Sequence, residues 1–176
     1  MKLSVRATNP RLRNTLLAMA KADQDMRISA VEKGGTWDYA LDLKHTKQLK
    51  RILDKYGWPT ISMVSGEASN DAWLIAQHAD HDIAFQKQCL ALLKAASPGE
   101  VSLHNIAYLE DRILVSEQKP QLYGTQFQGK AGKIKLHPIE DAVNVDKRRQ
   151  AMNLGTLAEY KKTMLEMAAR ANENRQ

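Results

Sequence analysis

The amino-acid sequence predicts a mostly α-helical protein, a single-domain helical bundle with one long irregular connection and room for a short β-hairpin. Three observations predict this class. Apolar residues recur at three- and four-residue steps over several segments, glycines and prolines separate those segments, and residues 119–138 are rich in both breakers. The 176 residues are the usual size of one compact domain, so we expect a single helical domain over residues 1–176, with its core at about 10–171.

The first two helices are expected at about residues 10–32 and 38–56, where apolar side chains follow helical spacing. Gly34-Gly35 stops the first helix, in the place where a C-terminal glycine is typical. Gly57-Trp58-Pro59 ends the second and forces an extended or turning segment through Val64.

A third helix begins near Ser65 and either continues to Ala96 or breaks near Asp80-His81-Asp82, where an aspartate can cap a new helix. Pro98-Gly99 connects it to a helix that Ser102 caps. That helix is expected to end at about residue 117. An irregular stretch follows, in which the alternating residues at 132–136 suit a hairpin. Two further helices are expected at about 143–153 and 156–171.

Composition excludes several classes of protein. With 43% hydrophobic and 26% charged residues, the chain is not a disordered one. Its uncharged apolar runs are too short to cross a bilayer, and its N-terminus lacks the apolar core of a signal peptide. A single cysteine, Cys89, excludes a disulfide framework and a Cys-rich zinc module, and we expect it to be a buried, inert thiol. We therefore expect a soluble, cytoplasmic protein without a membrane partner.

The net charge of +6 and the pI near 9.4 admit anionic partners. The cations are dispersed, however, and Lys44, Lys47, Lys50 and Arg51 form a solvated helix face. No RNA-binding aromatic motif, zinc finger or basic-region heptad is present. Nucleic acid is therefore not an expected partner.

The segment Gln77-His78-Ala79-Asp80-His81-Asp82 carries the strongest chemical signal. On a continuous helix, His78, His81 and Asp82 fall within roughly 100° of one another. They also continue an apolar stripe, and burying such groups costs a few kcal/mol unless each finds a partner. Other polar groups must therefore face them.

Two other helices supply candidate partners. Asp23 and Arg27 lie four residues apart on the first helix, and Asp111 and Arg112 lie on the helix after Pro98-Gly99. Three helices with charged or imidazole groups facing one interior suggest a pocket for general acid–base chemistry. Alternatively, Asp23 with Arg27 is an ordinary helix ion pair, and Asp111 with Arg112 ties helices together.

The loop Pro120-Gln121-Leu122-Tyr123-Gly124-Thr125-Gln126 is a second signal. It gathers a phenol, a hydroxyl and two carboxamides around a glycine, side chains that orient a ligand by hydrogen bonds. A capped turn explains the same residues equally well. Trp58 is expected in the core, with the wall of a pocket as the alternative.

The same three side chains have the residue types of a metal site. Histidines at i and i+3 with an aspartate at i+4 suit zinc, iron or nickel. The sequence has no HExxH motif and no pair of Glu-x-x-His elements for a di-iron bundle. We therefore predict no metal and no other cofactor, and keep a metal-dependent oxidase using His78, His81 and Asp82 as the second alternative.

The sequence contains, in chain order, the motifs DQxxR at residues 23–27, YGWP at 56–59, WLIxQHADHDxxFQ at 73–86, YLxDR at 108–112 and PQLYGTQ at 120–126. These motifs resemble those of a bacterial family, a domain of unknown function. PIED at 138–141 and VDxRR at 145–149 continue the resemblance, which spans about residues 20–162. It implies one helical domain and brings no reaction, cofactor or substrate. It also implies that the following residues act together: Asp23, Gln24, Arg27, His78, His81, Asp82, Asp111, Arg112, Tyr123 and Gln126.

We therefore expect a hydrolase-like enzyme that performs acid–base chemistry on a small polar or peptide-like substrate, with cyclisation, isomerisation or elimination open as reaction types. The expected catalytic residues are His78, His81, Asp82, Asp111 and Tyr123. The expected substrate-binding residues are Asp23, Gln24, Arg27, Trp58, Arg112 and Gln126. In this hypothesis the histidines transfer protons, an aspartate orients an imidazole, and the arginines hold a carboxylate or phosphate by forked hydrogen bonds. The alternative is a non-catalytic ligand-binding or immunity-type module.

Overall fold

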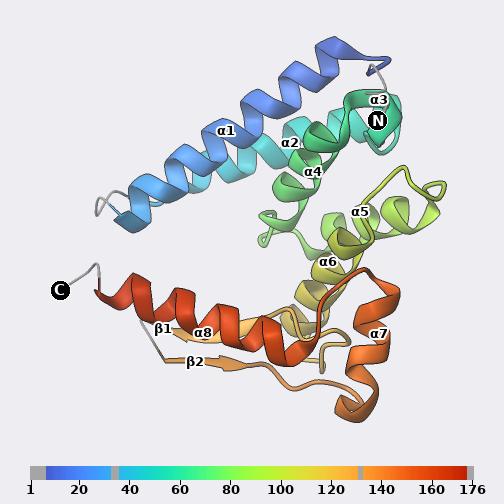
Figure 1. Ribbon diagram of the computed structural model, residues 1–176. Helices are drawn as coiled ribbons and strands as arrows, with labels where there is room; N and C mark the ends of the chain where they lie inside the picture. The colour runs from blue at the N-terminus through green and yellow to red at the C-terminus, as the bar shows by residue number, and fades with distance from the viewer. Residues whose placement is uncertain (1–6, 33–35, 131–132, 174–176) are drawn as a thin grey trace, which may run out of the picture. The chain divides into compact units, whose positions relative to one another are not determined.

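The computed structural model describes residues 7–32, 36–130 and 133–173, and confirms a mostly helical protein with one short antiparallel hairpin (Figure 1). The chain divides into two compact units, residues 1–102 and 103–176. Within the described residues, no helix is both long enough and apolar enough to cross a membrane.

The N-terminal unit contains five helices among its described residues: α1 (Pro10–Glu32), α2 (Tyr39–Tyr56), α3 (Ile61–Val64), α4 (Gly66–Gln77) and α5 (Ile83–Ala95). Helices α1 and α4 lie side by side and run in the same direction, because Arg13 pairs with Glu67 near their beginnings and Asp23 pairs with His78 near their ends. Helix α2 contacts both. The core between these helices holds Leu16, Leu49, Val64, Ile75, Phe85 and Leu93.

The helix boundaries follow local signals that the sequence contains. Asp38 caps α2 by accepting a hydrogen bond from the Leu41 amide, and Gly57 ends α2 with a positive φ of 69°. The predicted turning segment after Pro59 contains the short helix α3, which the sequence did not indicate. The predicted stop at Gly34-Gly35 lies outside the described residues.

The helix is interrupted between α4 and α5. This settles the alternative that the sequence left open, in which one helix continues to Ala96. The side chain of Asp82 accepts a hydrogen bond from the amide of Phe85 and so caps α5. The amide of the buried Gln86 donates to the Gln77 carbonyl and to Asp80, which holds the intervening turn against the end of α4.

The C-terminal unit contains α6 (Leu103–Ser116), β1 (Phe127–Lys130), β2 (Lys133–Leu136), a 3-10 turn (Ala142–Asn144), α7 (Val145–Ala151) and α8 (Leu157–Glu173). The two strands form the hairpin, with Phe127 opposite Leu136. Strand β2 contacts α8. The PQLYGTQ loop connects α6 to β1.

Candidate functional site

A buried aspartate and a histidine from two neighbouring helices form the centre of the candidate site. Asp23 of α1 is 1% exposed, and its Oδ2 lies 2.9 Å from Nδ1 of His78, the residue that caps the end of α4. A carboxylate only accepts hydrogen bonds, so His78 donates from Nδ1 and its Nε2 is left as the proton acceptor of a neutral imidazole. The side-chain amide nitrogen of Gln77 lies 3.5 Å from Nε2 of His78.

Arg27 binds the same carboxylate one helical turn further along α1. Its Nε lies 3.1 and 3.0 Å from the two oxygens of Asp23, and its Nη2 lies 3.0 Å from Asp23 and 2.8 Å from Asp42 on α2. Trp37 donates from Nε1 to the other oxygen of Asp42 at 3.1 Å, and its ring centroid lies 4.5 Å from the guanidinium carbon. Nη1 is the nitrogen of Arg27 that makes no hydrogen bond within the described residues.

This network fixes the charge of Asp23. Burial alone raises the pKa of this carboxyl, but the hydrogen bonds and positive charges of His78 and Arg27 outweigh burial and lower its pKa overall. Gln24 donates a further hydrogen bond to Asp23 at 2.8 Å. Asp23 is therefore ionised throughout the physiological range and holds both partners in place.

Members of this network line a cavity of about 280 Å³. The side chains that line it come from α1, from the start of α2 and from the turn after α4: Arg27, Trp37, Tyr39, Asp42, His78, Asp80 and His81. Trp37 and Tyr39 form an aromatic pair with ring centroids 6.4 Å apart. The cavity is large enough for a small polar molecule and places that molecule against His78.

The predicted trio of His78, His81 and Asp82 does not share one helix face. The helix ends at Gln77, so that His81 is exposed in the turn while still lining the cavity. Asp82 caps α5 and forms an ion pair with Lys50, whose Nζ lies 2.6 Å away. The hydrogen bond from Lys50 and then the one from the Phe85 amide lower the pKa of Asp82.

A metal site formed by His78, His81 and Asp82 would need all three side chains close together. Within the described residues, no group of three or more histidine, cysteine or acidic side chains is close enough together to hold a metal ion. The geometric premise of the oxidase alternative, three ligands on one helix face, is absent because of the break after Gln77.

Trp58 and Cys89 lie in the core of the N-terminal unit. Trp58 is 5% exposed and does not line the cavity beside His78. Cys89 is fully buried, and burial raises the pKa of its thiol to about 12. A protonated, enclosed thiol is not a nucleophile.

In the C-terminal unit, Asp111 organises the PQLYGTQ loop. Its fully buried carboxylate accepts hydrogen bonds from the backbone amides of Leu122, Tyr123 and Thr125 at 2.7 to 3.2 Å, and from the Thr125 hydroxyl at 2.9 Å. Burial raises the pKa of Asp111 although these donors oppose the change. The loop is therefore wrapped around one carboxylate, as expected of a structural turn.

The two glutamines of the motif close the same loop. Gln121 is fully buried; its amide nitrogen donates to the carbonyls of Gln126 and His137, and its amide oxygen accepts from the backbone of Gln126. The Gln126 side chain binds the Thr125 hydroxyl at 3.0 Å. These contacts hold the ends of the loop together and connect it to the chain after the hairpin.

Two arginines complete the loop from α7. Arg149, 2% exposed, donates to the carbonyls of Tyr123 and Gly155, and Arg148 donates to the carbonyl of Leu122. The Tyr123 hydroxyl lies 3.4 Å from Glu110, and burial raises the pKa of this phenol to about 12. Arg112 is half-buried on α6.

The predicted site residues thus belong to two separate sets. Asp23, Gln24, Arg27 and His78 form one connected network in the N-terminal unit, with His81 at the same cavity. Asp111, Tyr123 and Gln126 form the loop cluster of the C-terminal unit.

Sequence reasoning missed four residues of the cavity: Trp37, Tyr39, Asp42 and Asp80. Asp42 carried a usable signal, because it lies three residues before His45 and both are buried on the inner face of α2. His45 is 5% exposed, and burial lowers its pKa. Trp37 and Asp80 lie outside the helices, where helical periodicity gives no direction, and Tyr39 is the first residue of α2.

The fold and the network define a helical protein with a histidine–aspartate centre beside a small open cavity. A family model matches residues 10–171, and the chain belongs to that family, DUF6624, which is described as a family of unknown function. Comparison with curated proteins and with solved structures found no match.

Proposed function

We propose that the protein is an enzyme in which His78 performs acid–base chemistry on a small polar or peptide-like substrate bound in the cavity beside it. The observation that carries the proposal is the 2.9 Å contact between Nδ1 of His78 and the buried Asp23, next to a cavity of about 280 Å³. An ionised carboxylate behind an imidazole fixes its tautomer and stabilises the imidazolium that forms when it takes a proton.

In this proposal His78 accepts a proton from the substrate, or from a water that attacks it, at Nε2. Nη1 of Arg27, which makes no hydrogen bond within the described residues, donates a hydrogen bond to a substrate oxygen, because the side of the guanidinium formed by Nε and Nη2 is occupied by Asp23. His81, exposed at the same cavity, is positioned to return a proton to a leaving group. Hydrolysis is the first expectation, and cyclisation or elimination uses the same groups.

The catalytic role predicted for Tyr123 and the substrate-binding roles predicted for Arg112 and Gln126 stay predictions. None of these three residues lines the described part of the cavity, so they take no step in the proposal. Asp111 has a more limited role in it. A carboxylate that accepts hydrogen bonds from three backbone amides and a hydroxyl positions the loop that carries Tyr123 and Gln126, and has little capacity left to orient an imidazole.

A panel of p-nitrophenyl esters and short peptide amides tests the proposal. Turnover should be lost in His78→Gln and fall by roughly a hundredfold or more in Asp23→Asn, since positioned acid–base groups contribute about 10²–10⁴-fold. His104→Gln, which changes an exposed histidine of α6, is the matched control and should keep full activity. Equal activity of wild type and a folded His78→Gln variant would reject a catalytic His78.

The second candidate is a ligand-binding module without turnover. It is favoured by one observation: no serine, threonine or cysteine lines the described part of the cavity, so a covalent route through a hydroxyl or thiol of these residue types has no nucleophile there. Saturable binding of a panel compound, weakened in His78→Gln and accompanied by no product, would support this candidate over the enzyme.

A further inference from the structure

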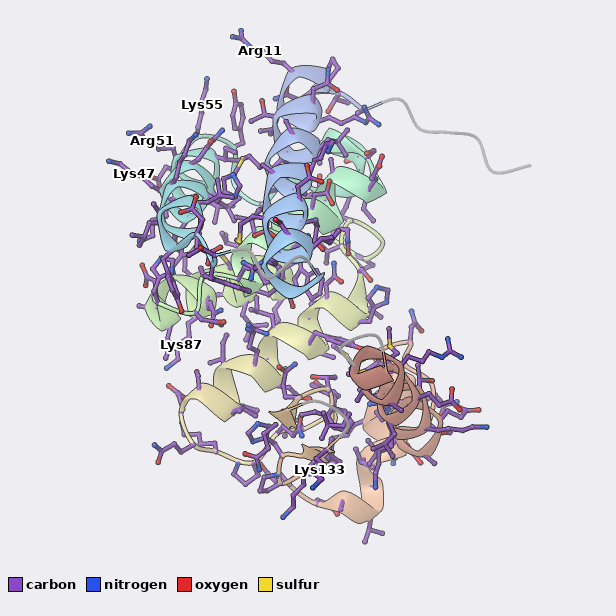
Figure 2. All side chains as sticks on the ribbon, turned by 90° about the vertical axis from the view of Figure 1, so that its left-hand side faces the viewer. Arg11, Lys47, Arg51, Lys55, Lys87 and Lys133 are labelled. Carbon is purple, nitrogen blue, oxygen red and sulfur yellow. The ribbon has the colours of Figure 1, made fainter. Side chains whose placement is uncertain are left out.

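The outer side of α2 carries a straight row of cations. Lys44, Lys47, Arg51 and Lys55 are all exposed, and their spacing of three, four and four residues places them within an arc of roughly 80°. Figure 2 shows Lys47, Arg51 and Lys55 projecting from the same side of this helix. At a rise of 1.5 Å per residue the row is about 16 Å long. We call these four residues the basic row.

Acidic side chains do not neutralise the basic row. Within the described residues none of its four members forms an ion pair. Of the two acidic residues on α2, Asp42 is buried against Arg27, and Asp54 lies at the edge of the row. Lys50 of the same helix is not counted in the basic row, because it forms an ion pair with Asp82.

A groove of about 180 Å³ lies beside the basic row, between α1 and α2. Its polar lining consists of Asn9, Arg11, Thr15, Gln48 and Tyr56. Tyr56 is 38% exposed, and the Nζ of Lys55 lies 4.9 Å from its ring centroid. The hydrogen bond from Lys55 and, to a smaller extent, the charge of Arg11 lower the pKa of this phenol.

We propose that the basic row and this groove bind single-stranded nucleic acid. Cations placed about 6 Å apart along a helix can follow the phosphates of an extended strand, and the ring of Tyr56 with the amides of Gln48 and Asn9 lies where unstacked bases would reach. This surface is independent of the cavity beside His78.

The fold also gives reasons to prefer a single strand over other polyanions. The main apolar side of α2 is buried in the core through Leu49, Ile52 and Leu53, so this side of the helix is not available to insert into a lipid surface. The sequence alone indicated dispersed cations and no nucleic-acid partner. It did not show that Arg11 of α1 and Tyr56 meet beside the same row.

Fluorescence anisotropy with a labelled single-stranded oligonucleotide of about 12 nucleotides tests the proposal. With five phosphate contacts, from the row and Arg11, the logarithm of the binding constant should fall against the logarithm of salt concentration with a slope of about −3.5. The triple variant Lys47→Gln, Arg51→Gln, Lys55→Gln should flatten the slope by about 2 and weaken binding at low salt by roughly tenfold or more.

The matched control is the triple variant Lys147→Gln, Lys161→Gln, Lys162→Gln, which removes the same charge from exposed positions of α7 and α8. It should bind like wild type, and thermal melting should show both variants folded. An equal loss of binding in the two variants would overturn the proposal. So would tighter binding to a duplex of the same sequence, or binding only to vesicles that contain anionic lipid.

Discussion

Asp42 Oδ1 lies 2.8 Å from Nη2 of Arg27, and this ion pair connects the start of α2 to the end of α1. Both side chains are largely buried, at 9% and 16% exposed. Because Arg27 also binds Asp23, the Asp42 contact extends the support of His78 to a third helix. Asp42 is thus the outer member of the network that positions the proposed catalytic histidine.

Replacing Asp42 by Asn should destabilise the protein by about 1–3 kcal/mol, since it removes the charge from a buried pair while Arg27 keeps Asp23 as a partner. Urea unfolding measures the change. Asp25→Asn is the control, because its pair with Lys21 is exposed on both sides and should contribute less than about 1 kcal/mol. Equal effects of the two substitutions would contradict the role given to Asp42.

Replacing Asp71 on α4 by Asn should stabilise the protein, whereas the substitution of Asp42 should destabilise it. Burial, with a smaller contribution from Glu67, raises its pKa to about 6, against 3.8 for an ordinary aspartate. The folded protein therefore binds a proton more tightly than the unfolded chain, and stability falls as pH rises from about 4 to 6. Asp71→Asn should stabilise the protein at pH 7 by about 1–2 kcal/mol, after allowance for solvent screening.

This gain should disappear below about pH 4, where the carboxyl is protonated in both states. Unfolding measured at both pH values tests the sign. A stabilisation that is the same at pH 4 and pH 7 would show that titration of Asp71 is not its cause.

Asp111→Asn should destabilise the C-terminal unit by about 2–4 kcal/mol, because an amide cannot accept at both oxygens from the donors of the PQLYGTQ loop. Thr125→Val, which removes the hydroxyl that donates to Asp111 and accepts from Gln126, should cost about 1–2 kcal/mol. Unfolding followed by circular dichroism gives both values. A stable Asp111→Asn variant without activity would instead restore the catalytic role expected from the sequence.

Gly124 is required by both its conformation and its surroundings. Its φ is +70°, and a Cβ would lie 2.7 Å from Leu157 Cδ1 and 2.8 Å from Ile139 Cδ1. Gly57 has a similar φ of +69° with nothing within 4 Å of its Cβ position. Gly57→Ala should therefore show the cost of strain alone, about 1 kcal/mol, and Gly124→Ala should cost about 1–3 kcal/mol more. Equal costs would mean that the loop moves to accept a methyl group.

The helical segments could be predicted from the sequence because their signals are local. Residues 10–32 form one helix, as the apolar spacing indicated, and the second helix ends at Tyr56, before Gly57. The short helix α3 was missed because four residues are too few for a periodic signal.

The candidate site was predicted in part, because only some of its residues carry a local signal. A histidine that replaces an apolar residue must have a partner, and that reasoning selected His78 and Asp23. The cap at Asp82 competes with continuation of the helix, and periodicity does not decide between them. Trp37 and Tyr39 reach the cavity through tertiary contacts, which spacing along the chain does not encode.

The tautomer of His78 tests the central claim most directly. Heteronuclear NMR of the imidazole nitrogens, above the pH at which the ring loses its charge, should show the proton on Nδ1 and a bare Nε2. Asp23→Asn should alter this preference, whereas His104→Gln should not. A proton on Nε2 of His78 in the wild-type protein would contradict the account, because the nitrogen proposed as the base would then have no lone pair to offer.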